Sequence, residues 1–262
     1  MSSLPADIST PLVADPIPGE QPRSYGIRRD LIELTVGYAL IMLAIWSPRP
    51  LQRLMDWAAL LWVLAATVGS FDSLTANGLR EKGFLRSFWV VETALLLAGV
   101  AVVIAGRLDT LHLPSTPMAF VSRYWAYAIW AVLQEFLLLD FFLRRLQRVL
   151  RSTLMAVVAT AVLFATAHLP NPILTPITLL WGVIACLLFL RYRNIFTLGM
   201  AHAIFGICIA ITVPAQVVHN MRVGLGYLTY RPHLHHQHHQ NHSPQMVSTQ
   251  ACVMDEAPTR RS

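Results

Sequence analysis

Three ionisable side chains lie inside apolar stretches of this chain, and they are the first candidates for chemistry. Glu135 lies in AVLQEFLLLDFF, His168 lies in LFATAHLPNP, and His202 lies in LGMAHAIFG. An ionisable group within a bilayer is costly, so it usually faces the protein interior and serves a function. Glu135 has no basic residue within one helical turn. A poorly solvated carboxylate accepts a proton more readily, which suits a general base.

A single intramembrane histidine is most often a satisfied core residue, but a glutamate and two histidines on three spans favour a shared site. Such a set can hold a water molecule, a divalent metal or a developing oxyanion. We therefore predict Glu135, His168 and His202 as catalytic residues. A divalent metal such as zinc, bound by His168 and His202, is the alternative use of the two imidazoles.

Other polar residues in the apolar stretches have simpler explanations. Asp140 precedes Arg144 by four residues, so the two predict an ion pair on one helix face. Glu92 follows Ser87 closely, and a structural and a functional role fit it equally well. Packing is the expected role of the three cysteines, whose spacing suggests neither a disulfide framework nor a zinc site. They are Cys186, Cys208 and Cys252.

The elements that would position these residues are transmembrane helices. Of the 262 residues 55% are hydrophobic and 13% are charged, and the mean hydropathy is +0.52. A soluble core of this size cannot bury so much apolar sequence, whereas lipid can solvate it. The prediction is an all-α fold, a polytopic transmembrane helical bundle of seven to eight spans. The expected spans are 31–47, 54–71, 87–106, 122–143, 152–168, 173–190 and 195–213.

Composition divides the chain into five segments. Residues 1–28 predict a disordered polar tail without a signal peptide, and 29–121 hold the N-terminal helices. A core follows at 122–213, then an interfacial helix at 214–232. Residues 233–262 form a tail whose tract HLHHQHHQNH is typical of low-complexity sequence or of adventitious metal binding.

Basic residues predict the orientation. The net charge is +6, and no basic run is long enough to indicate nucleic-acid binding. Cytoplasmic loops are enriched in arginine and lysine, which places the N-terminus in the cytoplasm. The side richer in basic residues holds Arg23, Arg28, Arg29, Arg80, Lys82, Arg86, Arg144, Arg145, Arg148, Arg151, Arg191 and Arg193. The other side holds Arg49, Arg53, Arg107, Arg123, Arg222 and Arg231.

The depth of the three candidates sets a condition on the fold. At about 1.5 Å per residue, Glu135 lies roughly 13 Å from Arg144, and His202 roughly 12 Å from Asn194. His168 lies about 25 Å from Arg151 by the same rule. The three side chains therefore meet only if the helical end between Arg144 and Arg151 protrudes, or if the fifth span tilts strongly.

The order and spacing of these residues resemble the CPBP or Abi family, the intramembrane endopeptidases related to CAAX processing and bacteriocin immunity. That family shows EExxxR on one span, FxxxH at the end of a later one, and HxxxN or HxxxD on another. Here Phe164 and His168 match the second motif, and His202 begins the third. The departures are Gln134 before Glu135, Leu139 at the arginine position and Gly206 at the last position.

The resemblance implies a hydrolase of the bacterial inner membrane that acts on a membrane-associated, in some cases prenylated, peptide. Glu135 would activate a water, and His168 and His202 would stabilise the oxyanion or position that water. Two alternatives stay open: an inactive CPBP-like scaffold or immunity factor, and a small transporter or metal carrier. Membrane lipids and the peptide substrate are the expected partners, nucleic acid is not expected, and the sequence does not indicate an oligomeric state.

Overall fold

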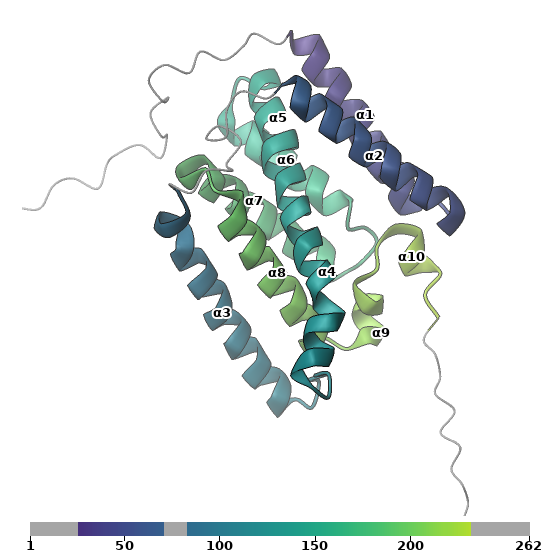
Figure 1. The fold of residues 1–262 in the computed structure, drawn as a ribbon, viewed down its shortest axis with the longest axis vertical. Coiled ribbons are helices and arrows are strands. Elements are labelled where there is room, and N and C mark those ends of the chain that lie inside the picture. Colours follow the sequence, from purple (N-terminus) through teal and green to yellow (C-terminus); the bar gives the residue numbers. More distant parts are fainter. Residues whose placement is uncertain (1–25, 71–82, 232–262) are drawn as a thin grey trace, which may run out of the picture. The chain divides into compact units, whose positions relative to one another are not determined.

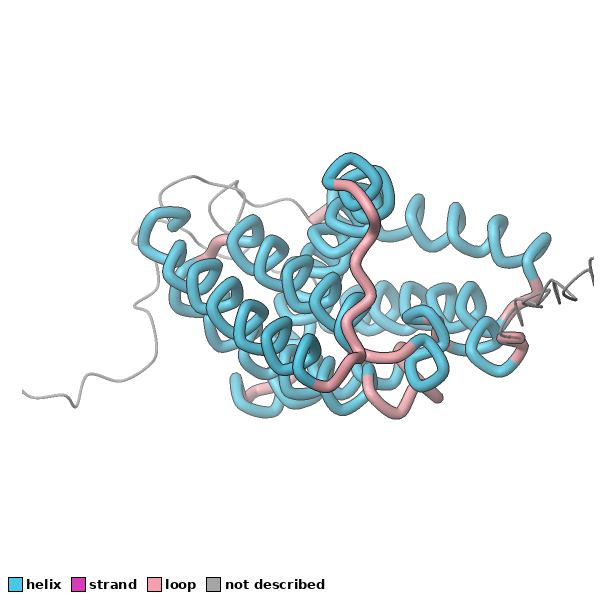
Figure 2. The backbone as a smooth tube through the Cα atoms, turned by 90° about the horizontal axis from the view of Figure 1, so that it is seen from below, coloured by secondary structure: helices cyan, strands magenta, loops and turns pink. Residues whose placement is uncertain are grey.

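The computed structural model describes residues 26–70 and 83–231, and these residues form helices and loops without a strand (Figure 2). This confirms the all-α prediction. The elements, labelled in Figure 1, are α1 (Ile27–Trp46), α2 (Arg49–Gly69), α3 (Phe84–Arg107), α4 (Pro117–Glu135), the π-helical segment η2 (Phe136–Leu143), α5 (Arg144–Val149), α6 (Thr153–Thr166), α7 (Leu174–Tyr192), α8 (Ile195–Thr212), α9 (Ala215–Val218), η3 (His219–Met221) and α10 (Gly224–Leu228).

Each predicted span coincides with a helix in the described residues. Five of these helices are long and apolar enough to cross a membrane: α2, α3, the continuous helix Pro117–Val149, α7 and α8. The apolar helix α6 is shorter, at 14 residues, and α1 carries several charged residues near its start. The number of spans, seven or eight, stays a prediction.

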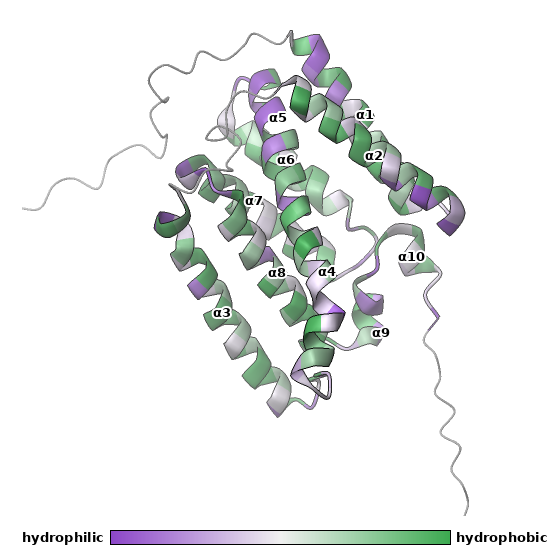
Figure 3. Cartoon of the chain, in the orientation of Figure 1, coloured by the Kyte–Doolittle hydropathy of each residue, from purple (hydrophilic) through white to green (hydrophobic). Residues whose placement is uncertain are grey.

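The apolar surface of the helices explains why the protein is an integral membrane protein. Leucine, valine and isoleucine side chains cover α3, where Leu96 and Val103 are 68% and 63% exposed. Green, hydrophobic ribbon accordingly dominates α2, α3 and α7 in Figure 3. Exposed apolar surface of this extent is unfavourable in water and suits contact with lipid.

Local sequence sets where the central helices begin. Thr116, Ser152 and Asn194 cap α4, α6 and α8 with their side-chain oxygens, which accept a backbone N–H three residues later at 3.1, 3.4 and 3.0 Å. Such caps satisfy amides that have no partner within the helix. Between α7 and α8, Arg193 takes a left-handed conformation (φ 49°), which makes the turn between them sharp.

One long helix explains how Glu135 and His168 come to lie at the same depth. The helix Pro117–Val149 extends well beyond Glu135, through η2 and α5. Val149 is therefore about 20 Å along the axis from Glu135, and α6 returns from Thr153 over a similar length. His168, just beyond α6, thus comes back to the depth of Glu135, as expected for a protruding helical end.

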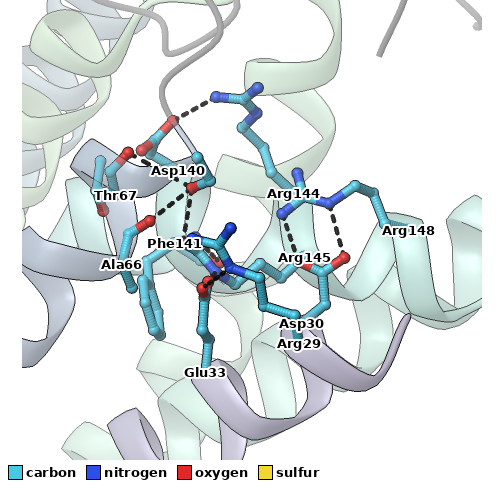
Figure 4. A network of polar contacts seen from close by, with 11 residues as sticks. Arg29, Asp30, Glu33, Ala66, Thr67, Asp140, Phe141, Arg144, Arg145 and Arg148 are labelled. Carbon is cyan, nitrogen blue, oxygen red and sulfur yellow. Dashed lines mark hydrogen bonds and ion pairs between the residues drawn. The ribbon is translucent and has the colours of Figure 1, made fainter. Parts of the chain in front are cut away.

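Buried ion pairs fix α1 against α5 (Figure 4). The Arg145 Nε donates to Glu33 Oε2 at 2.8 Å, and its Nη2 donates to Ser70 Oγ at 2.9 Å. Arg148 donates two hydrogen bonds to Asp30, at 2.9 and 2.7 Å. Asp30 and Arg145 are each only 1% exposed, so these charges depend on each other for solvation.

The same cluster contains a pair predicted from spacing. Arg144 Nη1 donates to Asp140 Oδ1 at 3.0 Å, which confirms that Asp140 has a structural partner. Arg29 also bonds Glu33, at 2.7 Å. Basic residues of α1 and α5 thus lie at one end of the bundle, as the charge pattern predicted. Which side of the membrane this end faces stays a prediction.

The chain after α8 differs from its prediction. Instead of one interfacial helix at 214–232 it forms α9, η3 and α10, three short pieces. Helix cannot continue because His219, Asn220, Met221 and Gly224 have φ values of 47–61°, which a right-handed helix does not allow. At the other end, α1 begins at Ile27, inside the predicted tail 1–28. The rest of that tail and 233–262 lie outside the described residues.

Candidate active site

Glu135 lies at the centre of a small polar cluster between three helices. It is the last residue of α4 and is fully buried. Its Oε1 accepts a hydrogen bond from the Trp181 indole Nε1 at 2.6 Å and is 2.8 Å from His202 Nδ1. Oε2 has no hydrogen-bond partner among the described residues. The π-helical segment that follows, η2, interrupts the regular helix directly after this residue, and such segments are frequent at functional sites.

His202 connects Glu135 to a cavity. It lies in the first half of α8, is 7% exposed, and lines a cavity of about 130 Å³. Because its Nδ1 faces the carboxylate, Nε2 is the ring nitrogen that remains for the cavity. Phe164 contacts the imidazole edge-on, with ring centroids 5.8 Å apart. Trp181 packs on it as well, at 6.2 Å, so that the ring is held from two sides.

His168 lines the same cavity from a different direction. Its Nδ1 lies 2.7 Å from the Phe164 carbonyl oxygen. A carbonyl can only accept, so Nδ1 carries the proton, and Nε2 of the neutral ring is an acceptor. Phe164 therefore serves both histidines: its backbone sets the tautomer of His168, and its ring packs edge-on against both imidazoles. The FxxxH spacing is explained by this i to i+4 contact.

The structure separates the roles of Gln134 and Glu135. Gln134 lines the cavity, whereas Glu135 is buried behind the wall and contacts two of the lining residues, His202 and Trp181. The three predicted residues are thus brought together, but Glu135 contacts His202 and not the cavity itself. Leu139, at the family's arginine position, is buried in the apolar core beside Leu138 and Leu143.

Sequence reasoning missed several residues of this site. Trp181, Tyr127 and Thr178 all line the cavity, from α7 and α4. Trp181 holds Glu135, yet an indole within an apolar span gives no signal that separates it from a packing residue. Thr178 donates to the Leu174 carbonyl at 2.8 Å, so its hydroxyl proton is already used.

Asn171 was missed as well, although the PNP sequence marked a turn. Its side-chain N–H groups donate to the Val218 and Arg222 carbonyls, both at 3.0 Å. Its oxygen accepts from the backbone of Ile173 and Leu174. These bonds hold the turn after His168 against the segment Val218–Gly224. That segment places Met221 and Val223 in the cavity wall, so Asn171 helps to enclose the site.

The remaining candidates lie apart from the cavity. Glu92 is exposed on α3, and Cys186 and Cys208 are buried free thiols. Within residues 26–70 and 83–231, no group of three His, Cys, Asp or Glu side chains is placed to hold a metal ion. Glu135 Oε1 is bonded to Trp181 and His202, and its Oε2 is buried without a partner among the described residues. Cys252 and the histidine-rich tract lie outside the described residues.

Residues 115–208 match the family model described as "Type II CAAX prenyl endopeptidase Rce1-like". This segment is Rce1-like. The match confirms the resemblance to the CPBP family that the motifs indicated. No curated protein and no solved structure matches the chain.

The Rce1-like segment contains the whole carboxylate–histidine cluster. It runs from the loop before α4 into α8 and includes Glu135, His168 and His202. Helices α1, α2 and α3 lie outside it. Of these, α1 contributes the carboxylates that bind Arg145 and Arg148, and α3 packs on α8. The protein is thus a membrane protein with a segment similar to type II CAAX prenyl endopeptidases, and the flanking helices support that segment.

Proposed function

We propose that this protein is an intramembrane endopeptidase that hydrolyses a peptide bond of a membrane-associated substrate. The observation that carries the proposal is the 2.8 Å contact between Glu135 Oε1 and His202 Nδ1 at the wall of a cavity. A carboxylate that orients an imidazole, whose other nitrogen faces the substrate, is the arrangement of a general base and its orienting group. The Rce1-like match supports a peptidase.

In the proposed reaction, His202 is the general base and Glu135 orients it. Nε2 of His202 takes a proton from a water molecule in the cavity, and the resulting hydroxide attacks the carbonyl carbon of the scissile peptide bond. The Glu135 carboxylate stabilises the imidazolium that forms. His202 then returns the proton to the leaving amine nitrogen, and the C–N bond breaks. The products are a carboxylic acid and an amine.

His168 positions the water in this scheme. Because its Nδ1 donates to the Phe164 carbonyl, Nε2 can accept a hydrogen bond from the attacking water and direct the oxygen lone pair. This assigns to Glu135 a role one step removed from the water, unlike the direct activation that the resemblance implied. The apolar walls formed by Leu174 and Ile177 suit a lipid-modified or otherwise apolar peptide.

The substrate class proposed is a peptide with a prenylated C-terminal cysteine motif, the class that the matched family's description names. The test uses full-length protein in proteoliposomes with a quenched fluorescent farnesylated peptide and its unprenylated twin. Wild-type protein should cleave the farnesylated peptide. Glu135→Gln should lower the rate by about three to four orders of magnitude, because the wrong imidazole tautomer is favoured. Unchanged cleavage in Glu135→Gln would disprove the carboxylate–imidazole mechanism.

A second candidate is a non-catalytic member that binds a membrane peptide without cleaving it. The specific observation in its favour is Gln134, an amide that lines the cavity where the family's motif has a glutamate. The same proteoliposomes distinguish the two functions. Binding of the farnesylated peptide without cleavage, with identical results for wild type and Glu135→Gln, would establish the non-catalytic function.

A further inference from the structure

The proposed reaction leaves the donor for the oxyanion unassigned, and most N–H and O–H groups of the cavity are already used. The indole N–H of Trp181 donates to Glu135. The Nδ1 atoms of His168 and His202 face the Phe164 carbonyl and Glu135. A tetrahedral intermediate needs at least one donor directed at its oxygen, so another cavity residue must supply it.

Tyr127 has one of the donors that remain, beside the amide of Gln134 and the indole N–H of Trp130. It lies on α4, two turns before Glu135, and lines the cavity with Gln134 and both histidines. Within residues 26–70 and 83–231 its hydroxyl makes no hydrogen bond. Tyr127 also borders a second cavity, of about 200 Å³, that Arg123 and Asn220 line. Gly206 borders both cavities too, so the hydroxyl stands where the two meet.

Gly206 shows why this hydroxyl can reach the site. A Cβ added at Gly206 would overlap the Tyr127 hydroxyl oxygen and would lie 2.7 Å from Cε1 of the ring. Since real Cβ atoms do not approach so closely, a side chain at position 206 would require the tyrosine ring at 127 to move. Position 206 is where the third motif carries asparagine or aspartate, one turn after His202. The hydroxyl therefore occupies the space of the missing polar side chain.

We propose that Tyr127 is a catalytic residue of this protein, whose hydroxyl donates a hydrogen bond to the oxyanion in place of the side chain absent at Gly206. The inference rests on the proposed function for its catalytic part. The steric relation between position 127 on α4 and position 206 on α8 does not depend on activity. The two parts are tested separately, so the failure of one is distinguishable from the failure of the other.

The activity test uses Tyr127→Phe, which removes the hydroxyl and keeps the ring. We expect kcat for the farnesylated peptide to fall by about two to three orders of magnitude, the usual cost of losing one oxyanion donor, with KM and the thermal midpoint unchanged. Tyr192→Phe, far from the cavity at the end of α7, is the matched control and should leave kcat unchanged. An unchanged kcat in Tyr127→Phe would overturn the assignment.

The steric relation between positions 127 and 206 is tested with two variants. One is Gly206→Asn alone, and the other combines it with Tyr127→Ala. Gly206→Asn should lower the thermal midpoint of the protein, because the new side chain overlaps the tyrosine. The double variant should recover the midpoint and, if wild type is active, part of the kcat that Tyr127→Ala alone loses. If wild type cleaves no peptide, the proposed function fails, and the midpoints still decide whether positions 127 and 206 share one space. A double variant no more stable than Gly206→Asn would overturn the inference that the side chains at 127 and 206 compete for the same space.

Discussion

Glu135 Oε1 lies 2.8 Å from His202 Nδ1, and this contact determines which ring nitrogen faces the cavity. The two residues come from α4 and α8, helices that pack along each other. With Trp181 fixing the same oxygen at 2.6 Å, the carboxylate cannot turn away from the imidazole. The pair is thus preorganised before a substrate binds, which is the condition for electrostatic stabilisation without reorganisation.

The two histidines should each be needed for catalysis. We expect His202→Ala and His168→Ala to lower kcat by about two to three orders of magnitude or more, since one removes the general base and the other the group that positions the water. Peptide cleavage in proteoliposomes measures this. Glu92→Gln, an exchange on the exposed face of α3, is the control and should retain the wild-type rate. A full rate in His202→Ala would exclude His202 as the base.

Gln134→Glu should raise the rate of peptide hydrolysis. The exchange keeps the side-chain volume and places a carboxylate in the cavity wall, where it can accept a proton from water. A positioned general base contributes roughly 10²–10⁴-fold, so an increase of at least about 10-fold is expected. Gln134→Ala is the control, because it removes the amide without adding a carboxylate. It should not accelerate the reaction. A slower Gln134→Glu enzyme of normal stability would contradict the prediction.

Arg145→Ala should destabilise the fold. It removes the Arg145 partner of the Glu33 carboxylate at the buried contact of α1 with α5, and breaking a buried ion pair costs about 3–5 kcal/mol. Thermal unfolding in detergent measures the change. Arg29→Ala removes the more exposed bond to the same carboxylate, with the arginine 45% exposed, and should cost about 0–1 kcal/mol. Equal losses for the two variants would refute the role of the buried pair.

The N-terminus should be cytoplasmic. In a Cys252→Ser background, a cysteine at Ser115 should react with a membrane-impermeant maleimide on intact cells, because the loop before α4 would face outward. A cysteine at Ser24 should react only after permeabilisation. Cys186 and Cys208 are buried and should not react with the maleimide, so the protein without added cysteines gives the background labelling. Labelling of both positions from the outside would reverse the conclusion drawn from the basic residues.

The sequence by itself determined the class of the protein and singled out three residues that the structure places around one cavity. Apolar runs longer than a soluble core can bury require a membrane, so the helices could be located without coordinates. The cost of an ionisable group in lipid selected Glu135, His168 and His202, and the motifs around them indicated the family. The i to i+4 pair of Asp140 and Arg144 was predictable as well, because its geometry is contained within one helix.

Tertiary structure decided everything that depends on which helices are neighbours. No spacing shows that the indole of Trp181 reaches Glu135 from another helix, or that Asp30 and Glu33 bind arginines more than a hundred residues later. Nor does the sequence reveal that Gly206 leaves room for Tyr127. These contacts join side chains across helix interfaces, and local periodicity specifies only the face of each helix, not the partner it meets.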